Sequence, residues 1–161
     1  MNDRPAIVPE TAVSPEAAFV LDADDARLLT EVGFLAASRG DVQRADAIFQ
    51  ALRTIRPARA YPWLGLAVAR MNAGRAPEAV TVLEQGEAVL VGAHGDEAVL
   101  LAAWRGFALQ LAGRNAESVR LLQVCARGTG EGATLAQALL GITPEADASA
   151  ARASESDSMT R

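Results

Sequence analysis

The sequence has 161 residues, about the length of one domain, and half of them are apolar, which is enough to form a core. A net charge of −5 argues against a nucleic-acid binder that works by neutralising phosphates, and one cysteine with one histidine excludes an intramolecular disulfide and a Cys/His metal cluster. Ala and Leu dominate the apolar residues and favour helices over strands, so we predict an all-α fold.

The N-terminal residues 1–13 contain Pro5 and Pro9 and no apolar run, which predicts a flexible arm rather than a signal peptide. Ser14-Pro15-Glu16 is typical of a helix start, with a capping hydroxyl, a proline and an acid near the positive helix end, and predicts a short helix over about 15–21. No apolar stretch reaches the roughly 20 residues that cross a bilayer, so we expect a cytoplasmic protein without membrane insertion.

The next predicted helix runs to Arg39 before Gly40, and either Asp22 or Asp24 can cap its start. Together with Asp25 these acids loosely resemble a cation site. Helix capping is the better interpretation, and we expect no metal.

From Gly40 the chain repeats itself. Gly40, Gly74 and Gly113 each follow one helical pattern and precede another, 34 residues apart for the first pair and 39 for the second. The five extra residues fit residues 92–96, which predict a loop by composition.

A 34-residue helix–turn–helix period with the pattern W-x2-L-G-x2-Y, A-x3-F and P is typical of tetratricopeptide (TPR) repeats. Small residues in this pattern let two helices approach, and larger ones fill the space between them. The matching residues are Leu29, Val32, Gly33, Ala45, Phe49 and Pro57 in repeat one, Trp63, Leu66, Ala67, Ala79 and Leu83 in repeat two, and Ala102, Arg105, Gly106, Ser118 and Leu122 in repeat three. Arg70 and Arg105 occupy usually apolar slots, which leaves the register of their helices open.

The domain is predicted over residues 14–141, with repeats over approximately 26–59, 60–93 and 99–132. Thr134 to Leu140 predicts a short capping helix, because the last repeat of an array has no neighbour to cover it. Residues 142–161 carry almost no large apolar side chain and predict a disordered tail. The expected architecture is a curved stack of seven or eight helices.

The first helices of TPR repeats line the concave face of the stack, and here that face carries apolar residues beyond those that the core needs. Leftover apolar surface usually marks a partner site. The predicted groove consists of Phe34, Tyr61, Leu64, Val68, Met71, Asn72, Trp104, Phe107 and Leu111. Leu100, Trp104, Phe107 and Leu111 also recur at the spacing of a core face, so core and groove both stay open for Trp104 and Phe107. Burying that stripe would turn Arg105 to solvent.

Other residues predict local roles. Cys125 lies among apolar neighbours and is expected to be a small core residue, and His94 has no acid–base partner at a recognisable spacing. Arg53, Arg56 and Arg59 cluster near a helix end, where they would stabilise the helix terminus, with an acidic partner as the alternative. No nucleophile–base pair, P-loop or dinucleotide fingerprint is present, so we expect neither an enzyme nor a cofactor.

The run from Ile48 to Leu52, followed by the run from Tyr61 to Leu66, resembles the junction of the first and second repeats in small TPR chaperones of bacterial type III secretion systems. The translocator (class II) chaperones resemble it most, and the needle-subunit chaperones are the second choice. The resemblance implies a cytoplasmic protein that holds an apolar segment of a secreted client, a translocator or a needle-type subunit, in its groove. It also implies self-association, as a homodimer, through Phe19, Val20 and Leu21. The alternative is a constitutive scaffold subunit of a secretion system or another bacterial assembly.

Overall fold

Seven helices and no strand make up the part of the chain that the computed structural model describes, residues 21–90, 92 and 95–142. They are α1 (Ala23–Ser38), α2 (Val42–Ile55), α3 (Ala60–Asn72), α4 (Ala76–Leu90), α5 (Gly95–Leu111), α6 (Asn115–Cys125) and α7 (Glu131–Leu140). The all-α prediction is confirmed. The predicted N-terminal arm, the short helix over 15–21 apart from its last residue, and the tail beyond residue 142 lie outside the described residues.

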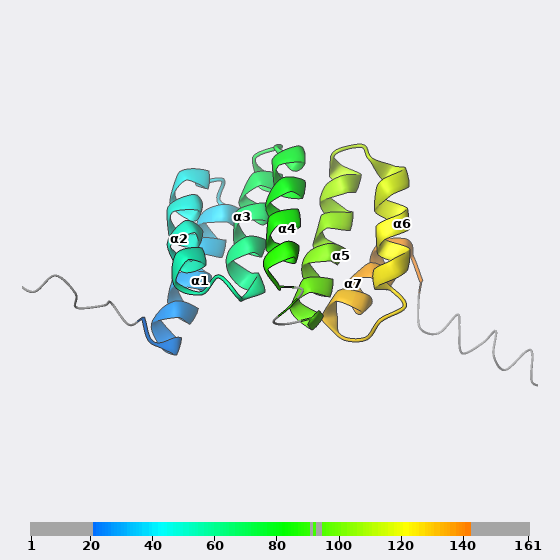
Figure 1. Ribbon diagram of the computed structural model, residues 1–161. Coiled ribbons are helices and arrows are strands. Elements are labelled where there is room, and N and C mark those ends of the chain that lie inside the picture. Colours follow the sequence, from blue (N-terminus) through cyan, green and yellow to red (C-terminus); the bar gives the residue numbers. More distant parts are fainter. Residues whose placement is uncertain (1–20, 91, 93–94, 143–161) are drawn as a thin grey trace, which may run out of the picture.

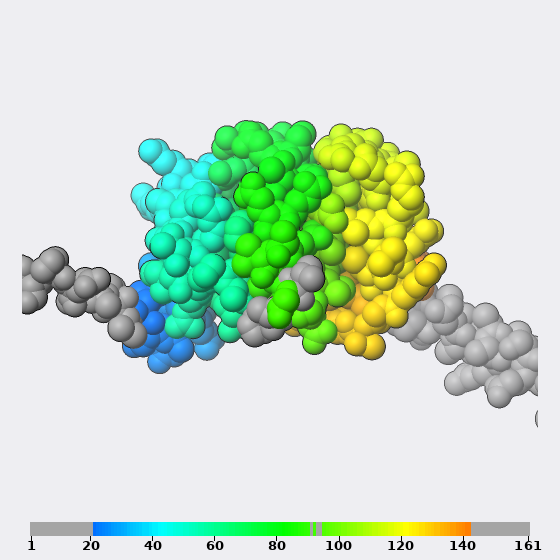
Figure 2. All heavy atoms as spheres, in the orientation of Figure 1, coloured from blue at the N-terminus to red at the C-terminus, as the bar shows by residue number. Residues whose placement is uncertain are grey.

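The helices form three antiparallel pairs stacked one after another, and α7 lies beside α5 and α6 at the end of the stack (Figure 1). Each helix packs against the next, and α1 also contacts α3 while α3 contacts α5. The helix α7 packs against both α5 and α6. Side chains of neighbouring helices fill the spaces between the ribbons and form one continuous surface in the same view (Figure 2). This helix–turn–helix stack is the predicted TPR architecture.

Local sequence signals set most helix ends. Of the two candidate caps for α1, Asp22 is the one used, and its Oδ1 accepts a hydrogen bond from the backbone N–H of Asp25 at 2.8 Å. Gly40, Gly74 and Gly113 follow α1, α3 and α5 with φ between 72° and 76°, a left-handed conformation in which a side chain would be strained.

The predicted loop over residues 92–96 is wrong at its end, because α5 already begins at Gly95. Asp96 and Glu97 lie in the first turn of α5, where acidic side chains favour the positive end of the helix dipole. The predicted capping helix is also longer than expected. It begins at Glu131 and ends at Leu140, and Gly141, which follows it, has a φ of 72°.

Small residues face large ones between paired helices. A Cβ on Gly33 would lie 2.8 Å from the Phe49 ring, and one on Gly106 would lie 2.4 Å from Leu122. Ser118 replaces the usual alanine in the third repeat, and its buried hydroxyl donates to the carbonyl of Gly106 at 2.7 Å. The hydroxyl is therefore tolerated at a fully buried position because it is hydrogen-bonded.

The two arginines in usually apolar slots form ion pairs between helices. Arg70 of α3 pairs with Asp46 of α2, and its Nε lies 3.4 Å from Oε2 of Glu78 in α4. Arg105 of α5 pairs with two carboxylates of α4, at Glu84 and Glu87. Arg105 thus does not turn to solvent, and its side chain is only 23% exposed.

Candidate functional site

The predicted groove residues lie on the three neighbouring helices α1, α3 and α5, and none of them is fully buried. Asn72 and Leu111 are exposed, and the other seven are half-buried. Phe34, Tyr61 and Val68 pack against the core formed with α2, whereas Leu64, Met71 and Trp104 pack against the core of the second and third repeats. These side chains therefore each contact the core on one side and keep an exposed side.

Trp104 and Phe107 are neither core residues nor free surface residues. Their rings contact each other edge to face, with centroids 6.0 Å apart. The two rings are half-buried, and Leu111 one turn further along α5 is 52% exposed. The stripe therefore becomes more exposed toward the end of α5.

Asn72 has a structural role that its position in the sequence did not reveal. Its Nδ2 donates to the carbonyl oxygen of Ala37 at 3.0 Å. That carbonyl is one of the last four of α1, which have no partner within the helix. The side chain thus ties the end of α3 to the end of α1.

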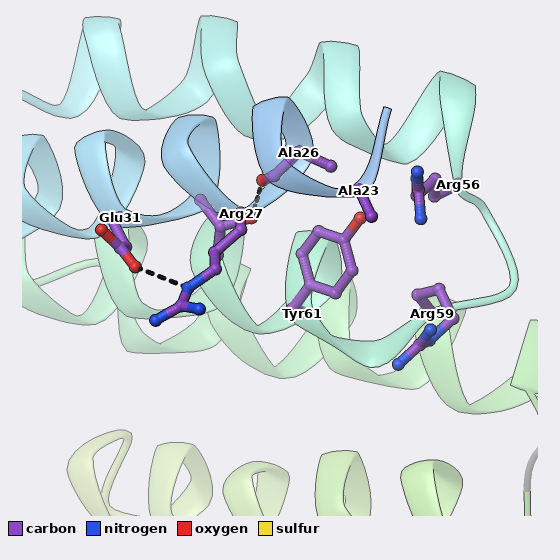
Figure 3. Close-up of a pocket in the computed structure, with 8 residues that line it drawn as sticks. Ala23, Ala26, Arg27, Glu31, Arg56, Arg59 and Tyr61 are labelled. Atoms are coloured by element: carbon purple, nitrogen blue, oxygen red, sulfur yellow. Dashed lines mark hydrogen bonds and ion pairs between the residues drawn. The ribbon is translucent and has the colours of Figure 1, made fainter. Parts of the chain in front are cut away.

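An open pocket of about 480 Å³ lies between α1, α3 and the loop that joins α2 to α3. Tyr61 points toward Ala23 and Ala26 of α1, with Arg27 on one side of its ring and Arg56 and Arg59 on the other (Figure 3). The complete lining is Ala23, Ala26, Arg27, Thr30, Glu31, Arg56, Arg59 and Tyr61.

The arginines of this pocket have different partners. Arg27 pairs with Glu31 one turn further along α1 at 3.1 Å, and Nε of Arg59 lies 2.9 Å from Oε1 of Glu97. Nη2 of Arg56 donates to the carbonyl oxygens of residues 21 and 22, each at 3.3 Å. The clustering of Arg56 and Arg59 in the sequence was the signal for this positive pocket.

Arg53, the third member of that sequence cluster, lies elsewhere. Its guanidinium carbon is 5.0 Å from the ring centroid of Trp63, in a cation–π arrangement. The indole Nε1 of Trp63 donates to the carbonyl of Pro57 at 3.1 Å. These contacts fix the loop between α2 and α3, which carries Arg56 and Arg59 of the pocket.

A smaller, more apolar pocket of about 260 Å³ lies between α5, α6 and the end of α4. Among the described residues that line it, Glu87 and Cys125 are the ionisable ones. Burial raises the pKa of the Cys125 thiol, so the thiol stays protonated at neutral pH and is a poor nucleophile. Burial also raises the pKa of Glu87, against the opposing effect of the Arg105 guanidinium.

Within residues 21–90, 92 and 95–142, no group of three or more His, Cys, Asp or Glu residues is arranged to hold a metal ion. No helix in this part of the chain combines the length and the apolar character needed to cross a membrane.

Leu21 is the only member of the predicted self-association segment inside the described residues, and it packs partly buried against the core of the first repeat. A second apolar feature, on α1, was not predicted from the sequence. Leu28, Val32 and Leu35 form an exposed stripe on α1, with exposed fractions between 40% and 60%. Their spacing at i, i+4 and i+7 was the signal that could have revealed it.

Residues 36–99 match the tetratricopeptide repeat family TPR_19. No curated protein matches the chain in sequence. Among solved structures, the Yersinia enterocolitica type III secretion translocator chaperone SycD is similar, with 22% identity over 83% of this chain and 88% of that one and a TM-score of 0.54.

Two further SycD structures agree with this result. One is an alternative dimer (22% identity, 84% of this chain and 91% of that one, TM-score 0.53), and the other is a complex with a peptide of the translocator YopD (21% identity, 84% and 92%, TM-score 0.52). The resemblance drawn from the sequence is thus confirmed in the fold: this chain forms a tetratricopeptide-repeat stack of the kind found in the translocator chaperone SycD.

Proposed function

We propose that this protein is a non-catalytic type III secretion chaperone, which holds an apolar segment of a secreted client along the predicted groove in the cytoplasm before export. The observation that carries the proposal is the row of half-buried apolar side chains on α1, α3 and α5, which contact the core without being covered by it. The similar chaperone SycD, in complex with a peptide of its translocator YopD, supports a peptide client of the translocator class.

The energetics of such a groove favour an extended apolar segment. A flexible segment loses conformational entropy when it is ordered, and apolar burial at about 25 cal/mol per Å² must offset that loss. Side chains that already pack against the core, such as Tyr61 and Leu64, have little rotamer freedom left to lose. The groove therefore binds with a smaller entropic penalty than freely rotating surface residues would.

Co-expression with the apolar secreted proteins encoded near this gene tests the proposal. We expect one of them, a translocator or needle-type subunit, to remain soluble as a stable complex only when this chain is present. Failure of every such protein to form a complex would refute the chaperone function. A stable complex with a subunit that is never secreted would instead favour a constitutive scaffold.

A matched pair of variants locates the client on the protein. Leu111→Glu places a charge at the exposed end of the groove, and Val89→Glu places one on α4 at a similar exposure, 46% against 52%. Loss of one buried leucine contact costs about 1.5–3 kcal/mol, so we expect Leu111→Glu to weaken client binding about tenfold or more. Equal affinities for the two variants would exclude this end of the groove from the binding site.

Trp104 provides a direct optical reading of groove occupancy. The other tryptophan, Trp63, is buried in the core, and Trp63→Phe leaves Trp104 as the only indole emitter. A client peptide that covers the half-exposed ring should shift its fluorescence to shorter wavelength in a saturable manner. An unshifted spectrum at saturating client would place the client elsewhere.

A further inference from the structure

The exposed apolar stripe on α1, formed by Leu28, Val32 and Leu35, belongs to the first helix pair of the stack (Figure 1). Residues four and seven apart lie on one face of a helix. Gly33 and Ala37 lie on the opposite side of α1 and are buried. Among the described helices α1 contacts only α2 and α3, so the stripe faces away from the stack. A row of three apolar side chains, each 40–60% exposed, indicates a contact surface.

Charged residues of opposite sign extend this row at its two ends. Asp24 lies one helical turn before Leu28, and Arg39 lies one turn after Leu35. Both charged side chains are exposed, and neither forms an ion pair with another of the described residues. The row therefore begins with a negative charge and ends with a positive one.

This order of residues is complementary to itself when the helix direction is reversed. Leu28 and Leu35 are equally far from the point between residues 31 and 32, and so are Asp24 and Arg39. In a contact with two-fold symmetry, residue i of one copy meets residue j of the other, and j meets i. Two antiparallel α1 helices therefore place Leu28 of each copy against Leu35 of the other, and Asp24 of each copy beside Arg39 of the other.

We propose that a second copy of this chain docks on the row, with the two α1 helices antiparallel across a two-fold axis near Val32. The apolar contacts at the axis are flanked by two ion pairs between Asp24 and Arg39. Glu31 lies close to the same axis, and it already pairs with Arg27 of its own helix at 3.1 Å, which limits repulsion between the copies.

The dimer leaves the predicted groove accessible. Phe34, the groove residue of α1, lies roughly a third of a turn around the helix from the row. The inference therefore holds whatever the groove binds. A pair of helices of 16 residues each forms a small interface, in the class of weak complexes that bury less than about 1,200 Å². We therefore expect reversible self-association that increases with protein concentration.

Sedimentation velocity of the full-length chain, over a wide range of protein concentrations, measures this association. Val32→Glu brings two carboxylates together near the axis, and we expect the variant to stay monomeric. Val119→Glu is the matched control, because both valines are 40% exposed on a helix, and it should associate as the wild type does. A wild type that is monomeric at every concentration would overturn the proposal, and so would equal association of the two variants.

Reversal of the flanking charges tests the antiparallel arrangement. Asp24→Arg alone and Arg39→Asp alone each replace two attractive pairs per dimer by repulsive ones. An exposed ion pair contributes about two- to fivefold, so each single variant should associate about tenfold more weakly. The double variant restores both pairs, and so does a mixture of the two single variants, so both should associate as the wild type does. A double variant that associates as weakly as the single variants would overturn the proposal.

Discussion

Replacement of Gly65 by alanine probes the close approach of α3 to α2. Gly65 lies on α3, and a Cβ there would be 2.2 Å from both Cε1 and Cζ of the Phe49 ring in α2. Ordinary contact begins at 3.4 Å, so the ring or the helix must move by about 1.2 Å, the difference between the two distances. Phe49 is fully buried, which leaves its ring no solvent-filled space to enter.

The expected cost follows from two opposing effects. Overpacking of a core costs about 1–3 kcal/mol, and the depth of this overlap places Gly65→Ala toward the upper value. Alanine recovers about 1 kcal/mol, because glycine is the poorer helix former. We therefore expect a net loss of about 1–2 kcal/mol in the free energy of unfolding, which at about 4 °C per kcal/mol lowers Tm by about 4–8 °C.

Thermal and urea unfolding of four variants, including one double variant, tests this expectation. Gly95→Ala is the matched control, because nothing lies within 4 Å of a Cβ at that helical position, and its Tm should equal or slightly exceed that of the wild type. Phe49→Leu removes the two atoms closest to the added methyl group. The double variant should therefore be more stable than the sum of the single changes implies. A Tm for Gly65→Ala as high as that of Gly95→Ala would refute the reasoning.

Two further predictions concern carboxylates that act between helices. Glu97 of α5 accepts hydrogen bonds from Arg59 and from the backbone N–H of Ala60, and so caps the start of α3. Glu97→Ala should therefore lower the free energy of unfolding in urea by about 1 kcal/mol, and the neighbouring Asp96→Ala should lower it less. Equal losses for the two variants would argue against this capping role of Glu97. Burial raises the pKa of Glu87, so the folded protein binds this proton more tightly than the unfolded chain does. The stability of the wild type relative to Glu87→Gln should then fall as pH rises from 4.5 through the raised pKa, and urea titrations that show a constant difference would contradict this.

The sequence by itself determined the helices, their pairing and most of their ends. The pairing within a repeat is local, because Gly33 meets Phe49 in the first repeat and Gly106 meets Leu122 in the third. The turn after each first helix is marked by a glycine whose left-handed conformation follows from local backbone sterics alone. The client assignment of the predicted groove residues stays a prediction, although their partial exposure fits it.

The tertiary structure alone decided which polar groups meet between repeats. Arg70 and Arg105 interrupt the expected apolar pattern. Only the packing of α2, α3, α4 and α5 shows that they form ion pairs with carboxylates of other helices. Glu97 likewise caps α3 from 37 residues away. The pocket around Tyr61 combines α1, α3 and a loop. Hydrophobic periodicity records which face of a helix is apolar, but an ion pair or a pocket depends on the rotation of one helix against another, which packing across the whole stack sets.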